Sequence, residues 1–70
     1  MKTNLIGKIC KCAHNQIGIV TFVREAQDRH LWYGINLYTG GAWQSRNPEI
    51  VADGIDEWVE KRYVEMLDAF

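Results

Sequence analysis

The alternation of apolar and polar residues constrains the fold of this chain more than any other feature. From Gly7 to about Ala52 the alternation has a period of two, and turn residues interrupt it about every 8 to 12 positions. This pattern is typical of a small all-β barrel or sandwich built from short strands. The strands are expected at residues 8–13, 17–24, 30–38, 42–46 and 49–52.

The period changes after Asp53-Gly54, where a helix is expected over residues 55–70. Asp53 is a candidate N-cap for this helix, and the i,i+4 spacing of Glu57 and Lys61 predicts an ion pair. One stripe of the helix would be apolar, formed by Ile55, Val59, Tyr63, Met66 and Phe70. We therefore expect residues 1–54 to form the barrel and residues 55–70 a helix docked on the same domain. The alternative is that the stripe binds a partner or forms a homodimer.

The size and charge of the chain limit the number of domains and the kinds of ligand that we expect. Seventy residues allow a single domain, and a pI near 6.0 argues against strong nonspecific nucleic-acid binding. Residues 1–24 carry four basic residues and no acidic one, whereas residues 49–70 carry seven acidic residues against two basic ones. We expect either that these two ends attract each other or that the acidic end binds a basic partner.

No apolar run approaches the ~20 residues of a membrane helix, so we expect no membrane association and a cytoplasmic location.

Cys10, Cys12 and His14 alternate along one expected strand. Side chains two apart on a strand lie almost 7 Å from each other, which is too far for neighbouring ligands of one metal ion. We therefore expect both cysteines to be reduced core residues, with no metal and no other cofactor. The chain contains no phosphate loop, nucleophile elbow or paired-acid motif, so we expect a protein that is not an enzyme.

The alternation of residues 30–38 predicts a strand with one face toward the core and the other toward solvent. One side, which consists of Leu31, Tyr33, Ile35 and Leu37, is expected to face the core, whereas Trp32, Asn36 and Tyr38 point outward. Gly34, in the middle of this strand, predicts a bulge or a close approach of another backbone. Amphipathic rings on a surface suit protein interfaces. The candidate binding residues are therefore Trp32, Tyr38, Trp43, Arg46 and Asn47. The alternative is that the C-terminal helix covers the outward rings.

Two stretches resemble SH3-like barrels of the KOW and CAP-Gly kind. "GKICKC", followed by "QIGIVTFV", is similar to the opening hairpin of these barrels, and "LWYGINL" looks like a CAP-Gly strand. The resemblance covers roughly residues 7–52 and implies a five-stranded SH3-like barrel, here followed by one C-terminal helix. It implies a small protein-binding module of an adaptor or inhibitor kind, with a KOW-like nucleic-acid-binding domain as the alternative. The "WQSRNP" ending of the expected barrel also resembles accessory proteins of bacteriophages.

Overall fold

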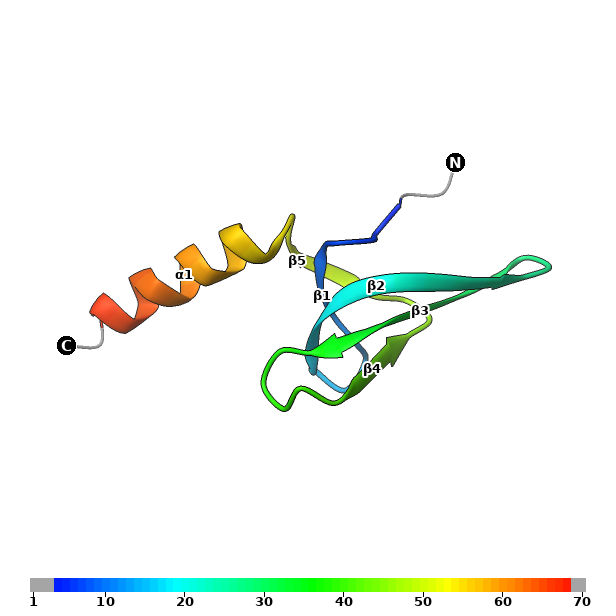
Figure 1. Cartoon of the computed structure of the whole chain (residues 1–70), viewed down its shortest axis with the longest axis horizontal. Helices are drawn as coiled ribbons and strands as arrows, with labels where there is room; N and C mark the ends of the chain where they lie inside the picture. Colours follow the sequence, from blue (N-terminus) through cyan, green and yellow to red (C-terminus); the bar gives the residue numbers. More distant parts are fainter. Residues whose placement is uncertain (1–3, 69–70) are drawn as a thin grey trace.

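The chain folds into one antiparallel sheet followed by one helix (Figure 1). A computed structural model describes residues 4–68. The predicted class, mainly β with five strands and a C-terminal helix, is confirmed, and the strand positions follow the period-two segments closely. The elements are β1 (Ile9–Lys11), β2 (Ile17–Ala26), β3 (Arg29–Asn36), β4 (Ala42–Ser45), β5 (Glu49–Ala52) and α1 (Ile55–Asp68).

The sheet is open rather than closed into the barrel that the sequence predicted. The strand order is β4-β3-β2-β1-β5, so within the described residues β4 and β5 lie at opposite edges and do not pair. Each of these edge strands has four residues. Alternation reports which face a side chain occupies, whereas closure depends on the tilt and stagger of the strands. The period-two pattern therefore could not decide whether the edges meet.

The hairpin of β2 and β3 is the longest feature of the sheet and projects away from α1 (Figure 1). The expected strands at 17–24 and 30–38 leave residues 25–29 as their connection, but β2 runs to Ala26 and β3 begins at Arg29. Gln27 takes a φ of 56°, which allows the tight turn between them. The chain measures 49 Å along its longest axis. The hairpin tip and α1 lie at its two ends.

A β-bulge in β2 changes which residues face the core. Val20 pairs with Gly34, but Phe22 pairs with Tyr33, so the register shifts at Thr21. Beyond the bulge, the odd-numbered Val23 packs against the core. A Cβ on Gly34 would overlap the carbonyl oxygen of Ile19. The close backbone approach predicted at Gly34 is thus confirmed, and it lies beside the bulge.

The connected core cluster combines aliphatic, sulfur-containing and indole side chains, and Ile9 and Ala52 are also buried. Cys10 and Val20 are almost completely buried at its centre, and Cys12 is buried at its edge. The prediction that both cysteines are core residues is confirmed. The connected buried cluster consists of Leu5, Cys10, Cys12, Val20, Trp32 and Trp43.

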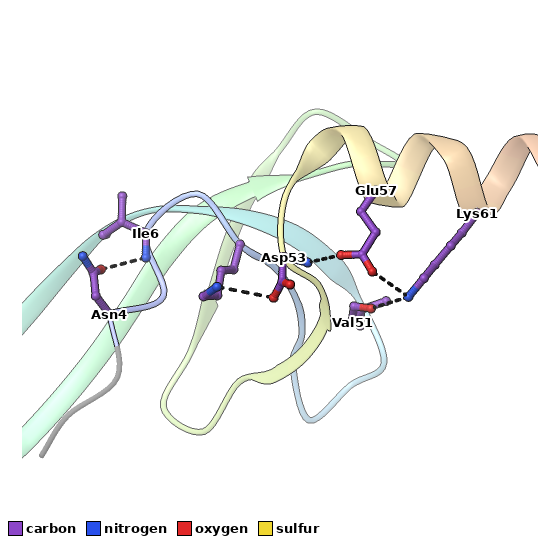
Figure 2. Close-up of polar contacts among 7 residues, drawn as sticks. Asn4, Ile6, Val51, Asp53, Glu57 and Lys61 are labelled. Carbon is purple, nitrogen blue, oxygen red and sulfur yellow. Dashed lines mark hydrogen bonds and ion pairs between the residues drawn. The ribbon is translucent and has the colours of Figure 1, made fainter.

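Polar contacts join the start of α1 to the end of β5 (Figure 2). The Asp53 N–H donates to Glu57 Oε2 at 2.6 Å, and Lys61 Nζ donates to the Val51 carbonyl at 3.1 Å. The predicted ion pair of Glu57 and Lys61 is confirmed at 3.6 Å. The predicted N-cap at Asp53 is wrong, because the Asp53 carboxylate pairs with Lys8 and the Gly54 carbonyl accepts the helical bond from Trp58 N–H.

The apolar stripe of α1 is not docked on the sheet, contrary to the expectation from its amphipathic pattern. Ile55, Val59, Tyr63 and Met66 are between 41% and 61% exposed. Phe70, the last residue of the predicted stripe, lies outside the described residues. Figure 1 shows α1 extending away from the sheet beyond β5. An amphipathic pattern identifies the face that a helix tends to bury but not what that face meets.

Candidate functional site

The structure separates the five predicted site residues into three groups. Trp32 and Trp43 are core residues, with exposed fractions of 8% and 3%, so their assignment to an outward binding surface is wrong. Tyr38 lies next to α1. Arg46 and Asn47 are exposed at the end of β4 and are the part of the predicted set that borders an open surface.

Trp43 is held in the core by steric fit and by one hydrogen bond. Its indole lies over Gly18, where a Cβ would come within 2.5 Å of Trp43 Cγ. Its Nε1–H donates to the Gln16 carbonyl at 2.8 Å. The ring is therefore buried with its polar atom satisfied, as buried indoles require.

Trp32 is buried because the core lies on the opposite face of β3 from the one predicted. It pairs with Val23 on β2 and with Ser45 on β4, and both partners face the core. Ile35, expected inside, is 48% exposed. Both faces of β3 carry large apolar side chains, so alternation alone did not identify the buried one.

Tyr38 links the β3–β4 turn to the helix. Its ring is exposed and meets Trp58 edge-on, with the ring centroids 6.0 Å apart. The Arg62 guanidinium lies 5.7 Å from the centroids of both rings. The helix therefore meets one of the predicted outward rings, and it does so through Trp58 and Arg62 rather than through the apolar stripe.

Buried Asn36 fixes the turn that carries Tyr38. The Asn36 side-chain oxygen accepts bonds from Tyr38 N–H at 2.8 Å and Thr39 N–H at 3.1 Å. This Asx-type geometry explains why an amide side chain occupies a buried position. Asn36 was expected on the surface, so its position is a further consequence of the inverted face of β3.

An open groove runs along the outer face of the β2–β3 hairpin and reaches the end of β4. We call it the hairpin groove; its volume is about 570 Å³. The side chains that define its chemistry are Arg24, Arg29, Leu31, Tyr33, Arg46 and Asn47. Arg24 pairs with Leu31 in the β2–β3 register, so the two side chains share a face of the hairpin. The sequence pointed to Arg46 and Asn47 as binding residues, whereas it placed Arg29 between two expected strands and Leu31 and Tyr33 in the core.

A stacked aromatic pair continues the surface of the hairpin groove. The rings of Phe22 and Tyr33 lie parallel, with centroids 4.6 Å apart and an angle of 9° between their planes. Phe22 is 54% exposed. The two residues pair directly across β2 and β3, but only because of the bulge at Thr21. The sequence offered no signal of this register.

The three arginines of the hairpin groove form no ion pair with the residues that the structure describes. Within residues 4–68, the ion pairs of the sheet join Lys8 to Asp53 and Lys11 to Glu49, and His30 lies within hydrogen-bond distance of Glu25. The remaining pairs of the described chain lie within α1. Arg24, Arg29 and Arg46 take part in none of them, although Asp28 also borders the groove. The groove therefore presents a net positive surface on a chain whose net charge is −1.

The two cysteines have the properties of core side chains. Both thiols are free and buried. Burial raises the pKa of the Cys10 thiol above its ordinary value of 9.0, while the positive charge of Lys8 acts in the opposite direction. Within the part of the chain that the structure describes, no three His, Cys, Asp or Glu residues lie close enough together to hold a metal ion.

The helix of the described chain, α1, lacks the length and the apolar character needed to cross a membrane.

Comparison with protein-family models, with curated proteins and with solved structures gave no significant match to this chain.

Proposed function

We propose that this chain is a small, non-enzymatic protein-binding module that binds an acidic segment of its partner in the hairpin groove. One observation carries the proposal: three arginines without an ion-pair partner in the described chain border a stacked pair of aromatic rings, exposed Phe22 and half-buried Tyr33. The groove is open to solvent along the hairpin, so a segment of another chain has access to it.

The chemistry of these side chains suits carboxylates flanked by apolar groups. A guanidinium binds a carboxylate through two parallel hydrogen bonds and also stacks on aromatic rings. Exposed aromatic rings supply contact area at a low cost in side-chain entropy. Arg24, Arg29 and Arg46 would thus orient the acidic side chains of a partner, while Phe22 and Tyr33 pack on its apolar ones.

Single-stranded nucleic acid is a second candidate ligand, and the stacked pair of Phe22 and Tyr33 is the observation that favours it. Bases stack on exposed rings, and arginines neutralise phosphates. Of the basic residues in the first third of the chain, Lys8 and Lys11 already pair with acidic side chains, and Arg24 borders the groove. Lys2 lies outside the described residues. The basic surface is therefore small for a nucleic-acid-binding domain, which places this candidate second.

A binding titration tests both candidates on the full chain. The probes are a fluorescein-labelled peptide of alternating glutamate and tyrosine, and a labelled oligothymidylate of similar length. We expect the peptide to bind more tightly, and the double variant Arg24→Ala, Arg29→Ala to weaken its binding at least about tenfold. Lys11→Ala is the matched control, because it removes one positive charge away from the groove and should leave the affinity nearly unchanged. Tighter binding of the oligothymidylate would favour the second candidate, and no binding of either probe would contradict both.

We also propose a cytoplasmic location for this module. Cys10 and Cys12 are free thiols on adjacent core positions, and small secreted domains usually use their cysteines in disulfides. Fractionation of the native host with an antibody against the chain tests this location.

A further inference from the structure

α1 carries an acidic and apolar face that the described part of its own chain leaves exposed. This helix face consists of Asp56, Val59, Glu60, Tyr63 and Leu67, which are all exposed and follow the spacing of one side of a helix. Trp58 and Arg62, which contact Tyr38, lie on the other side of α1.

The acidic side chains of the helix face have no ion-pair partner among the described residues. The ion pairs of α1 join Glu57 to Lys61 and Arg62 to Glu65, and neither includes Asp56 or Glu60. The arginines of the hairpin groove likewise have no ion-pair partner among the described residues. The described chain thus holds an unneutralised acidic surface and an unneutralised basic surface.

The two surfaces match in chemistry but cannot meet within one molecule. The helix face combines carboxylates with an aromatic ring and aliphatic groups, and the hairpin groove combines guanidinium groups with Tyr33 and Leu31. Figure 1 shows α1 and the hairpin tip at opposite ends of the chain, which is 49 Å long. Contact between these surfaces therefore requires a second molecule.

We propose that α1 of one copy of this chain lies in the hairpin groove of a second copy. Because each copy has both surfaces, two copies placed side by side in opposite directions form two identical contacts and close as a two-fold dimer. Opposite charges across such contacts set the orientation and the partner. The inference rests on the proposed function, since it names the chain's own helix as an acidic segment that the groove binds.

The dimer also explains how a projecting helix remains folded. α1 has 14 residues, and isolated helices of about this length are marginal in water. Its own chain supports it mainly near β5 and Tyr38. Packing of Val59, Tyr63 and Leu67 on a second copy would supply the apolar burial that helices in proteins depend on.

A charge-swap experiment on the full chain tests this contact. Molar mass is measured by light scattering after size exclusion, from about 5 to about 500 µM protein. We expect a concentration-dependent dimer whose dissociation constant rises at least about tenfold between about 50 and about 500 mM NaCl. The groove variant Arg24→Glu, Arg29→Glu and the helix variant Asp56→Lys, Glu60→Lys should each be monomeric alone. An equimolar mixture of the two variants should form a heterodimer, because both contacts regain opposite charges. Far-UV circular dichroism checks that each variant is folded, and Lys11→Glu is a control that should still dimerise.

Two results would overturn the proposal. One is a wild-type chain that stays monomeric over the whole concentration range. The other is a dimer that the groove variant preserves, which would mean that the helices pair with each other or with another surface. The peptide titration separates these failures from failure of the proposed function. If the chain stays monomeric but binds the glutamate-tyrosine peptide through Arg24 and Arg29, the proposed function is supported and the dimer is refuted. If the chain forms a dimer that depends on the groove but does not bind the peptide at any concentration, only the contact between two copies is supported.

Discussion

Trp32 and Tyr33 are neighbours on β3 whose side chains lie on opposite faces of the sheet. Trp32→Ala removes a core indole and should lower the free energy of unfolding by about 3–5 kcal/mol. Tyr33→Ala removes a half-buried ring stacked on Phe22 and should cost about 1 kcal/mol. Urea unfolding followed by circular dichroism measures both. A larger loss for Tyr33→Ala would contradict the face assignment of β3.

Gly18 lies directly against the indole of Trp43, where a larger side chain has no space. Gly18→Ala places a methyl group against Trp43 and should destabilise the fold by about 1–3 kcal/mol, because the buried ring has to move. Gly54→Ala is the comparison variant, since a Cβ there meets no atom within 4 Å and its N-cap position affects α1 rather than the sheet. Thermal melts of the two variants compare them. Equal melting temperatures would show that Trp43 adjusts without loss.

The buried thiol of Cys10 predicts a fall in stability at alkaline pH. The folded state raises the pKa of Cys10 above the unfolded value of 9.0, so the folded state holds the thiol proton more tightly. This contribution to stability is fully present below pH 9.0 and is lost as the pH rises through the folded-state pKa. Denaturant unfolding at neutral and at alkaline pH measures the loss. Cys10→Ala should show a smaller fall over the same interval, and an equal fall would assign it to other groups.

At the scale of elements, Trp58 packs α1 against Tyr38 of the β3–β4 turn. Trp58→Ala removes the edge-on contact with Tyr38 and one of the two rings beside Arg62. We expect the helical signal at 222 nm to fall in dilute solution, while the sheet keeps its melting temperature within a few degrees. Val64→Ala, a change on an exposed position of the same helix, should preserve or increase the helical signal. Loss of helix in Val64→Ala but not in Trp58→Ala would contradict this role.

At the scale of the whole molecule, stability should decrease from the sheet core toward the two ends. Amides in β1 and at the start of β2 surround the buried Cys10 and Val20, so we expect them to exchange most slowly with deuterium. The hairpin tip and the second half of α1 have few buried side chains and should exchange fastest in dilute protein. Mass-spectrometric exchange over peptides compares these regions. Exchange in α1 as slow as in β1 would contradict an undocked helix, and slowing of α1 and the hairpin together at high concentration would support the dimer.

The local patterns of the sequence determined which segments are strands and where the helix begins. Side chains alternate along a strand and recur every 3.6 residues along a helix, so short windows carry this information. The prediction of five strands and of a helix starting at residue 55 therefore agrees with β1 to β5 and α1. The ion pair of Glu57 and Lys61 depends only on helical spacing and was predicted for the same reason.

Tertiary structure decided which faces are buried and which residues form the site. Both faces of β3 are apolar, and the bulge at Thr21 shifts the register with β2, so the burial of Trp32 depends on strands distant in sequence. The same shift stacks Phe22 on Tyr33, and the pairing of β4 with β3 brings Arg46 to the groove that Arg24 and Arg29 line. Alternation assigns a residue to a face, but only the packing of the whole sheet determines which face meets the core and which meets solvent.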